Sequence, residues 1–427
     1  MEHIEKLQSS NKFSKGSKSQ SNRGSEGDTL HGKTLAIAAL SSIPLVMTLG
    51  NSMLIPVLPS MEKHLNISSF QTSMIITVYS LVAIVLIPIA GYISDHIGRK
   101  KVIIPSLILT AIGGLISGWA SWKLNDAYWI ILIGRALQGI GASGAFPIVL
   151  PLVGDMFQSE EEVSSTLGMI ETANTLGKVL SPILGALLAG FIWFIPFLSI
   201  PVFCAISLIL MIFFVKSPKT KSESIPFKQF FHNIKQIFVD NGKWLVAIFT
   251  IGAILMFILF GVLFYLSDIL EKEYAITHVK KGLLLAIPLG ALCLASYTTG
   301  KKIKENKILM KWLTFSGIGL LAISTAVLSF SEYLWFLLGM FFLGGIGIGV
   351  SLPCLDALIT EGIEKEQRGT ITSIYSSMRF IGVAAGPPIM ALLMVHTLHF
   401  LFYFLSGFAV VAALLTMLSI KPDKTST

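Results

Sequence analysis

Residues 91–101 read Gly91-Tyr-Ile-Ser-Asp95-His-Ile-Gly98-Arg99-Lys-Lys and join two apolar segments, 70–93 and 102–122. Neither segment contains Asp, Glu, Lys or Arg, and each is long enough to cross a bilayer, which takes roughly 20 residues of α-helix. A short basic loop between two such segments is typical of membrane helices that are joined on the cytoplasmic side. This stretch therefore predicts a helical membrane protein.

Ten further segments of the chain have the same apolar character. We therefore predict twelve transmembrane helices, at 35–57, 70–93, 102–122, 128–153, 166–188, 192–215, 244–267, 282–300, 309–329, 334–356, 370–393 and 400–420. Only 13% of the residues are charged, against roughly 25% in an average soluble protein. An ordinary soluble enzyme is excluded, and we expect no catalytic site, no metal or other cofactor, and no nucleic-acid partner.

The predicted spans form two groups of six. We expect five regions: a disordered cytoplasmic tail, a first bundle, a linker, a second bundle and a short cytoplasmic tail, at 1–33, 34–215, 216–243, 244–420 and 421–427. Apolar residues at helical spacing from Ile225 to Val239 predict an amphipathic helix on the membrane surface. Of the 32 Lys and Arg residues, 24 lie on the side of both termini and 5 on the opposite side, which predicts cytoplasmic termini.

The two groups of spans share a stretch of small residues with a proline. It comprises Gly177, Ser181, Pro182 and Gly185 in the first group, and Gly382, Gly386 and Pro387 in the second. Both copies follow a polar, acidic loop, which indicates duplication. Small residues four apart form a stripe on one helix face and allow close helix contact. We expect a seam between the two halves here, and plain helix packing is compatible with the same pattern.

These stretches resemble motifs of the major facilitator superfamily. Residues 91–101 resemble its signature loop, Arg135-Ala-Leu-Gln138-Gly139 resembles its second motif, and 177–185 resembles the motif associated with antiporters. The end of span 1, 50–59, is similar to that of twelve-helix drug:proton antiporters. The resemblance covers 34–420. It implies an all-α membrane fold of two pseudo-symmetric six-helix bundles, alternating access and proton-coupled export. Asn51 departs from it, because many proton-coupled relatives have an acid in span 1.

The charges of the signature loop predict a gating latch. Asp95 lies at the end of span 2, where a carboxylate can face a helix N-terminus. Arg99 lies within reach of a second acid, for which Asp155 is the candidate, and Gly91 and Gly98 leave room for close helix approach. The resemblance implies that such a cluster holds the cytoplasmic side closed when the transporter faces outward.

Four charged residues lie well inside the predicted spans, where burial of a charge is expensive and usually functional. Arg135 is roughly 10 Å inside span 4, and the resemblance implies a role in proton coupling. Lys178 and Arg379 are deeper, roughly 18 Å and 14 Å inside spans 5 and 11. Glu171, two turns from Lys178, is the candidate proton carrier, and pairing with a basic residue is the alternative.

The excess of cations over acids in the spans predicts the substrate. A cavity with Asn51, Lys178 and Arg379 suits an anionic or amphipathic compound such as a siderophore, a drug or a lipid-linked metabolite. Cations neutralised by backbone carbonyls would instead leave an apolar cavity for varied drugs, and a nutrient importer on the same fold is the alternative function. We expect a monomer in the bacterial plasma (inner) membrane, with protons, the bilayer and a small molecule as partners.

Overall fold

The computed structural model describes residues 33–157, 159–216, 227–303, 306–363, 365–394 and 398–420. In these ranges the chain is helical, without strands, and twelve helical segments are long and apolar enough to cross a membrane. The first helix spans 33–52. The others are η1 Ile55–Val57, α2 Leu58–Leu65, α3 Ser69–Ile97, α4 Arg99–Lys123, α5 Tyr128–Ser143, α6 Phe146–Met156, α7 Glu160–Phe191, α8 Ile195–Phe214, α9 Phe227–Lys272, α10 His278–Ile303, α11 Lys307–Val327, η2 Leu328–Phe330, α12 Leu334–Gly362, α13 Lys365–Leu393 and α14 Leu398–Ser419. The all-α, twelve-span prediction is confirmed.

Local sequence sets the turns at both ends of α3. Asn66 ends α2 with a left-handed backbone, φ 51°, a conformation that asparagine tolerates better than most residues. Ser68 and Gln71 then form a capping box that satisfies backbone donors at the start of α3. At the other end Gly98 has φ 101°, which only glycine adopts readily, so α4 can follow α3 directly.

Two predicted spans are interrupted. The first runs from Lys33 to Leu65 but passes through η1, where Pro56 removes a backbone donor. The fourth divides into α5 and α6 around Gly144, followed by Pro147. A Cβ on Gly144 would lie 2.2 Å from the Ser106 hydroxyl, so the break also fits a close contact with α4. The hydropathy pattern does not predict either break, because the chain stays apolar on both sides of it.

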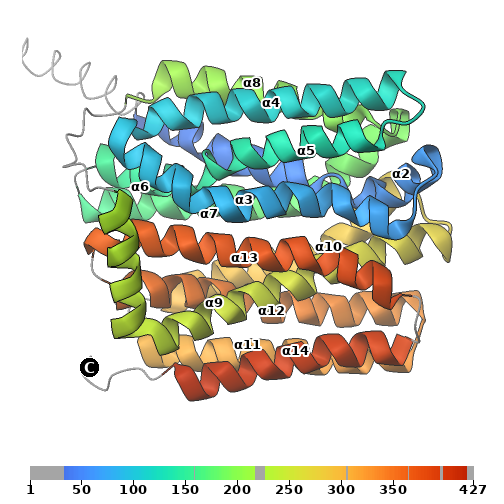
Figure 1. Cartoon of the computed structure of the whole chain (residues 1–427). Helices are drawn as coiled ribbons and strands as arrows, with labels where there is room; N and C mark the ends of the chain where they lie inside the picture. The colour runs from blue at the N-terminus through green and yellow to red at the C-terminus, as the bar shows by residue number, and fades with distance from the viewer. Residues whose placement is uncertain are drawn as a thin grey trace, which may run out of the picture.

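The helices form two bundles, shown in Figure 1 as the blue-to-green half and the yellow-to-red half. α3 to α8 belong to the first half and α9 to α14 to the second. The halves pack together mainly through α3 against α13 and α7 against α10. We call the end of the molecule that carries residues 33 and 420 the terminal end, and the opposite end the distal end.

Equivalent contacts in the two halves support the predicted duplication. Lys100, at the start of α4, donates to the carbonyls of Ile212 and Val215 at the end of α8. Lys311, at the start of α11, donates to the carbonyl of Met417 at the end of α14, 3.0 Å away. Each lysine therefore binds the unpaired carbonyls of a helix C-terminus. The third span of each half thus fastens the sixth in the same way.

The linker helix and the tails fall partly outside the described residues. α9 begins at Phe227, and Figure 1 shows its first part at a steep angle to the other helices, across the terminal end. Whether this part lies on a membrane surface stays a prediction. The predicted tails, except Lys33, lie outside the described residues, and so do linker residues 217–226.

Candidate functional site

Arg135 on α5 is fully buried and forms hydrogen bonds with the first helix, α3 and α5. Its Nε donates to the carbonyl of Ile75, 2.8 Å away, and one terminal nitrogen donates to the carbonyl of Gly50 at 3.1 Å. The side-chain oxygens of Gln138 and Asn51 accept the remaining bonds. The guanidinium is therefore held by neutral oxygen acceptors, which offset much of the penalty for burying a charge. Snorkelling to an interface is excluded for this conformation.

Asn51 binds Arg135 instead of lining the cavity. Its Oδ1 lies 2.6 Å from the guanidinium, and only 6% of Asn51 is exposed. The guanidinium carbon also lies 4.6 Å from the centroid of the Tyr79 ring, a favourable cation–π distance. In this conformation Asn51 is turned toward Arg135, and a contact of Asn51 with substrate stays a prediction. The sequence shows that Asn51 is a polar residue in an apolar span, but it does not show that Arg135 on α5 binds it.

Glu171 on α7 is held by an amide instead of a cation. The Nδ2 of Asn174 donates to both carboxylate oxygens of Glu171, at 3.2 and 3.3 Å. Thr48, on the first helix, donates to the Oδ1 of Asn174 at 2.6 Å, which fixes the orientation of the amide. Among the described residues no ion pair involves Glu171. The structural pairing considered for this acid is therefore absent from this conformation.

Lys178 lines a pocket between the two halves. It is within electrostatic range of Glu171, Asp356, Arg379 and Cys293, and within the described ranges it forms no ion pair. The other lining residues come from both halves and are mostly apolar: Ser52, Ile55 and Pro182 from the first, and Leu259, Phe260, Leu263, Leu285 and Leu289 from the second. A cation in an otherwise apolar pocket is a candidate contact for a negatively charged group.

Arg379 on α13 is paired with an acid. Its terminal nitrogen lies 3.4 Å from the Asp356 carboxylate on α12. The side chains keep 20% and 38% of their surface exposed, although Arg379 lies roughly 14 Å along its span. The pair is therefore partly exposed at this depth. Of the two predicted cavity cations, Lys178 is the one without a bound acid.

The predicted latch residues lie together, but inside the first half. Arg99 forms an ion pair with Asp95 at 3.0 Å and a second one with Asp155. These residues connect the ends of α3, α4 and α6, and all three belong to the same bundle. Gly91 is the part of the motif that meets the other half, because a Cβ there would lie 3.4 Å from the Ser373 hydroxyl on α13. Latching of the halves by these charges stays a prediction.

The small-residue stripe on α7 packs within the first half. A Cβ on Gly177 would meet the carbonyl of Leu45 at 3.3 Å, and one on Gly185 would meet that of Met53 at 2.0 Å. The Ser181 hydroxyl donates to the carbonyl of Gly177 at 2.6 Å. The contacts of Gly177 and Gly185 are with the first span, and the Ser181 bond lies within α7, so a seam between the halves stays a prediction for these three residues.

The copy on α13 behaves in the same way. A Cβ on Gly382 would lie 2.0 Å from the carbonyl of Ala253, and one on Gly386 would lie 2.7 Å from that of Phe257, both on α9 of the same half. Pro387 lies within the same helix. Pro182 is different, since its carbonyl approaches Gly282 on α10 of the other half. A stripe of small residues predicts a close helix contact. Because a helix has several neighbours, the sequence does not show which of them packs against the stripe.

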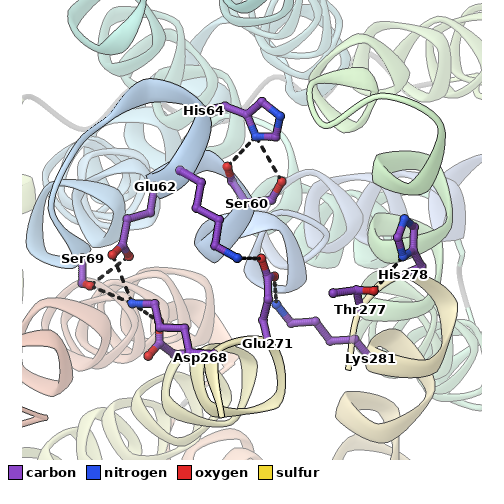
Figure 2. A network of polar contacts seen from close by, with 11 residues as sticks. Ser60, Glu62, His64, Ser69, Asp268, Glu271, Thr277, His278 and Lys281 are labelled. Carbon is purple, nitrogen blue, oxygen red and sulfur yellow. Dashed lines mark hydrogen bonds and ion pairs between the residues drawn. The ribbon is translucent and has the colours of Figure 1, made fainter. Parts of the chain in front are cut away.

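Sequence reasoning missed a cluster of ion pairs at the distal end (Figure 2). Lys63 on α2 contacts Glu271 on α9 at 3.1 Å, and Glu62 contacts Lys272 at the same distance. Glu271 also binds Lys281 on α10 at 2.9 Å. A signal was available, because Glu-Lys occurs at the end of span 1 and again at the end of span 7.

Comparison with known proteins identifies relatives over nearly the whole chain. A model of the Major Facilitator Superfamily matches residues 40–382 and 306–427. The "Bacillibactin exporter" of Bacillus subtilis is 55% identical over 383 residues, which cover 90% of this chain and 95% of that protein. The "Multidrug resistance protein 2" of the same organism is 25% identical over 90% of this chain and 95% of that protein.

The fold also matches solved structures. The crystal structure of the human organic anion transporter MFSD10 (TETRAN) superposes with a TM-score of 0.72 at 18% identity, over 90% of this chain and 99% of that one. A bacterial homologue of the lysosomal transporter Spinster, in an inward-facing and occupied conformation, also gives 0.72 at 14% identity, over 91% of this chain and 96% of that one. At these identities the likeness concerns the fold.

Proposed function

The chain belongs to the Major Facilitator Superfamily, and we propose that it exports an anionic siderophore of the bacillibactin kind in exchange for protons. The relative named as bacillibactin exporter supports this substrate, since it is 55% identical and aligned over 95% of its length. Two proteins this similar over their whole length commonly keep the same cavity. A small-molecule transporter is in any case what the family and the twelve spans establish.

The observation that carries the proposal is Lys178 in the pocket between the halves. Transfer of an anion from water into an apolar pocket is unfavourable unless an opposite charge or hydrogen-bond donors meet it there. Lys178 offers such a charge, and its ammonium is not already held by an acid as Arg379 is held by Asp356. Phenolate or carboxylate oxygens of a substrate would therefore find a partner at Lys178.

The orientation of the chain follows from its basic residues. We place the terminal end in the cytoplasm, because 24 of the 32 Lys and Arg residues lie on that side. Substrate would then load from the terminal end. One chain contains both halves and the pocket between them, so a monomer in the bacterial plasma membrane suffices for transport.

Proton coupling is assigned to Glu171 and Arg135. Glu171 is half-buried on the pocket-lining helix, two turns from Lys178, and its carboxylate is bound by a neutral amide. It can therefore take up and release a proton without first breaking an ion pair. Arg135 contributes a buried charge on α5 that is held by carbonyls and amides. Asp356, which is paired with Arg379, is the next candidate carrier.

The Arg99 cluster is assigned to gating at the cytoplasmic side. Asp95, Arg99 and Asp155 already form one unit on the first half, and Gly91 lets α3 approach α13 closely. When the terminal end closes, Asp95 is placed to meet the N-terminus of α13, whose helix dipole attracts a carboxylate. This contact would hold the cytoplasmic side shut while substrate leaves on the other side.

The substrate is tested with Lys178→Gln in inside-out vesicles. We expect uptake of iron-free bacillibactin to fall by roughly tenfold or more, as expected for loss of a charge-assisted contact. Lys280→Gln serves as the control, since Lys280 is an exposed lysine at the distal end of α10. An apolar cavity for varied drugs would instead show equal uptake of a cationic dye and bacillibactin, and little effect of Lys178→Gln on either.

Binding can be separated from transport with a native cysteine. Cys293 on α10 is half-buried and near Lys178, whereas Cys204 and Cys354 are buried. Substrate in the pocket should therefore slow alkylation of Cys293 in the parent and protect it less in Lys178→Gln. If bacillibactin gives no protection in the parent, this pocket is not its binding site.

The proton carrier is tested with Glu171→Gln. We expect this variant to lose uptake driven by a pH gradient while it retains exchange of labelled for unlabelled substrate, because exchange needs no net proton movement. Persistence of gradient-driven uptake at the parental rate would transfer the assignment to Asp356. Uptake by right-side-out vesicles, with the gradient directed inward, would instead indicate an importer.

A further inference from the structure

The distal ends of the two halves carry the same dipeptide. Glu62-Lys63 lies near the end of the first span, and Glu271-Lys272 lies at the end of the seventh. These spans are the first of each half, so they occupy equivalent positions in the duplicated fold. A pseudo-twofold axis that relates the halves would bring the two dipeptides face to face at the distal end.

The two dipeptides bind each other reciprocally. Lys63 Nζ lies 3.1 Å from Glu271 Oε1, and Lys272 Nζ lies 3.1 Å from Glu62 Oε1. Each acid thus pairs with the lysine of the other half. We call these four residues the distal latch. Figure 2 shows Glu62 and Glu271, with dashed lines marking their polar contacts.

Further contacts close the distal end beneath the latch. The hydroxyl of Ser267, 1% exposed on α9, donates to the carbonyl of Ile55 in η1 at 2.8 Å. A Cβ on Gly190 of α7 would lie 3.2 Å from the ring of His278 on α10. Both contacts join the first half to the second. The distal end is therefore closed in this conformation.

Each latch residue of the second half has another partner within its own half. Glu271 is also bound by Lys281 at 2.9 Å, and Lys272 is also bound by Asp268 at 2.8 Å. Lys281 is 1% exposed, so its bond to Glu271 lies out of water. If the halves separate, neither Glu271 nor Lys272 loses its last counter-charge. The latch can therefore open without leaving a buried charge unpaired, which would otherwise be strongly unfavourable.

We propose that the reciprocal Glu62–Lys272 and Lys63–Glu271 pairs form a latch that keeps the distal end shut and must break before each release of substrate. Lys281 and Asp268 keep the opened second half stable, so that the latch can open and close repeatedly. This inference goes beyond the proposed function, because it does not depend on the identity of the substrate or the proton carrier.

The test uses Ser267→Cys as a reporter in a chain whose native cysteines are replaced by alanine. Ser267 is buried at the contact between the halves, so its thiol should react with a membrane-impermeant maleimide only when the distal end opens. Glu62→Gln with Lys63→Gln removes both cross-half pairs and leaves Lys281 and Asp268 paired. We expect labelling to accelerate by roughly three- to tenfold, as for loss of two partly exposed ion pairs.

Lys280→Gln is the matched control, because Lys280 neighbours Lys281 in sequence but is exposed, and it should leave labelling unchanged. The parent itself provides a second measurement. Raising ionic strength to about 1 M shortens the screening length to roughly 3 Å, and this should accelerate labelling without any mutation. An unchanged rate in both the double variant and high salt would overturn the proposal, and so would equal acceleration by Lys280→Gln.

The side of labelling separates this proposal from the proposed function. Reaction from the external face of right-side-out vesicles supports both the latch and the cytoplasmic termini. Acceleration seen only in inside-out vesicles would retain the latch and contradict the proposed orientation. No acceleration from either side would contradict the latch and leave the orientation and substrate to their own experiments.

Discussion

The two ends of the molecule use the same kinds of charged residue in different ways. At the terminal end, Arg99 binds Asp95 and Asp155, and all three lie in the first half. At the distal end, Lys63 binds Glu271 and Lys272 binds Glu62, and both pairs cross between the halves. The first cluster can move with its bundle as a unit. The second must break whenever the bundles separate.

This difference shows which charges are able to decide the conformation. A pair within one half has the same contacts in every arrangement of two rigid bundles, so it contributes mainly to the stability of that half. An ion pair between the halves forms in only one arrangement of the bundles. Its full free energy therefore biases the equilibrium between the arrangements. The signature loop, 91–101, also differs from its counterpart in the second half. The counterpart contains Gly300-Lys301-Lys302 but no acid that corresponds to Asp95.

The largest effect is expected from Glu271→Gln. This change breaks a cross-half pair and also leaves Lys281, 1% exposed, without its carboxylate. Removal of one partner from a buried ion pair costs roughly 3–5 kcal/mol, so the melting temperature of the purified protein should fall strongly. Adding Lys281→Met should recover most of the loss. If Glu271→Gln melts no lower than Lys63→Gln, the buried pair is not what stabilises this end.

Arg99→Gln should lower stability by less, roughly 1–3 kcal/mol. Its partners Asp95 and Asp155 are 45% and 21% exposed, so water solvates them in part after the arginine is removed. Because the cluster lies within one half, labelling of Ser267→Cys at the distal end should stay at the parental rate. Faster distal labelling with an unchanged melting temperature would mean that the terminal-end cluster controls the conformation directly.

A smaller effect is expected for the coupling between Glu62 and Lys272. Lys272 is 35% exposed and Glu62 22%, and pairs in such settings contribute roughly 0.2–1 kcal/mol. The single changes Glu62→Gln and Lys272→Gln and the double change form a mutant cycle on the labelling rate. We expect a coupling of this size at low salt that fades at high salt. A coupling of zero at low salt would show that the two residues do not interact.

The smallest effect concerns Glu273, in the loop after α9. Burial, followed by the charges of Glu332 and Asp268, raises the pKa of Glu273 above its usual value. Folding therefore favours the protonated form, and the stability it contributes is present below the usual pKa, roughly 4.3, and is lost as pH rises through the raised value. As pH rises over this interval, the melting temperature of the parent should therefore fall slightly more than that of Glu273→Gln. If the melting temperatures of the two proteins change in parallel with pH, the prediction is contradicted.

The sequence predicted the architecture because the spans are long and almost free of charge. It missed the breaks at Pro56 and Gly144, since a local loss of hydrogen bonds leaves hydropathy unchanged. The contact between Arg99 and Asp155 could be expected because both residues stand at the same end of neighbouring spans. The partners of Gly185 and Gly382 could not, because helix periodicity gives the small face but not the helix that it meets.

For the functional residues, too, the sequence did not show which side chains from different helices meet. The depth of Arg135, Lys178 and Arg379 in their spans followed from the sequence. The sequence did not distinguish Arg379, which forms an ion pair, from Lys178, which forms none among the described residues. Asn51 binds Arg135 on a helix distant in sequence, and Asp356 binds Arg379 on the next helix, contacts that the sequence does not show. The repeated Glu-Lys dipeptide was visible, yet only the arrangement of the halves shows that each copy binds the other.

The central claim is that the distal latch sets which end of the molecule is open. It is tested most directly by distances between spin labels at exposed positions on both halves, Asp126 with Glu332 at the distal end and Lys101 with Lys302 at the terminal end. In the Glu62→Gln, Lys63→Gln variant we predict that the distal distance lengthens and the terminal distance shortens. A distal distance that stays unchanged, or two ends that widen together, would contradict the claim.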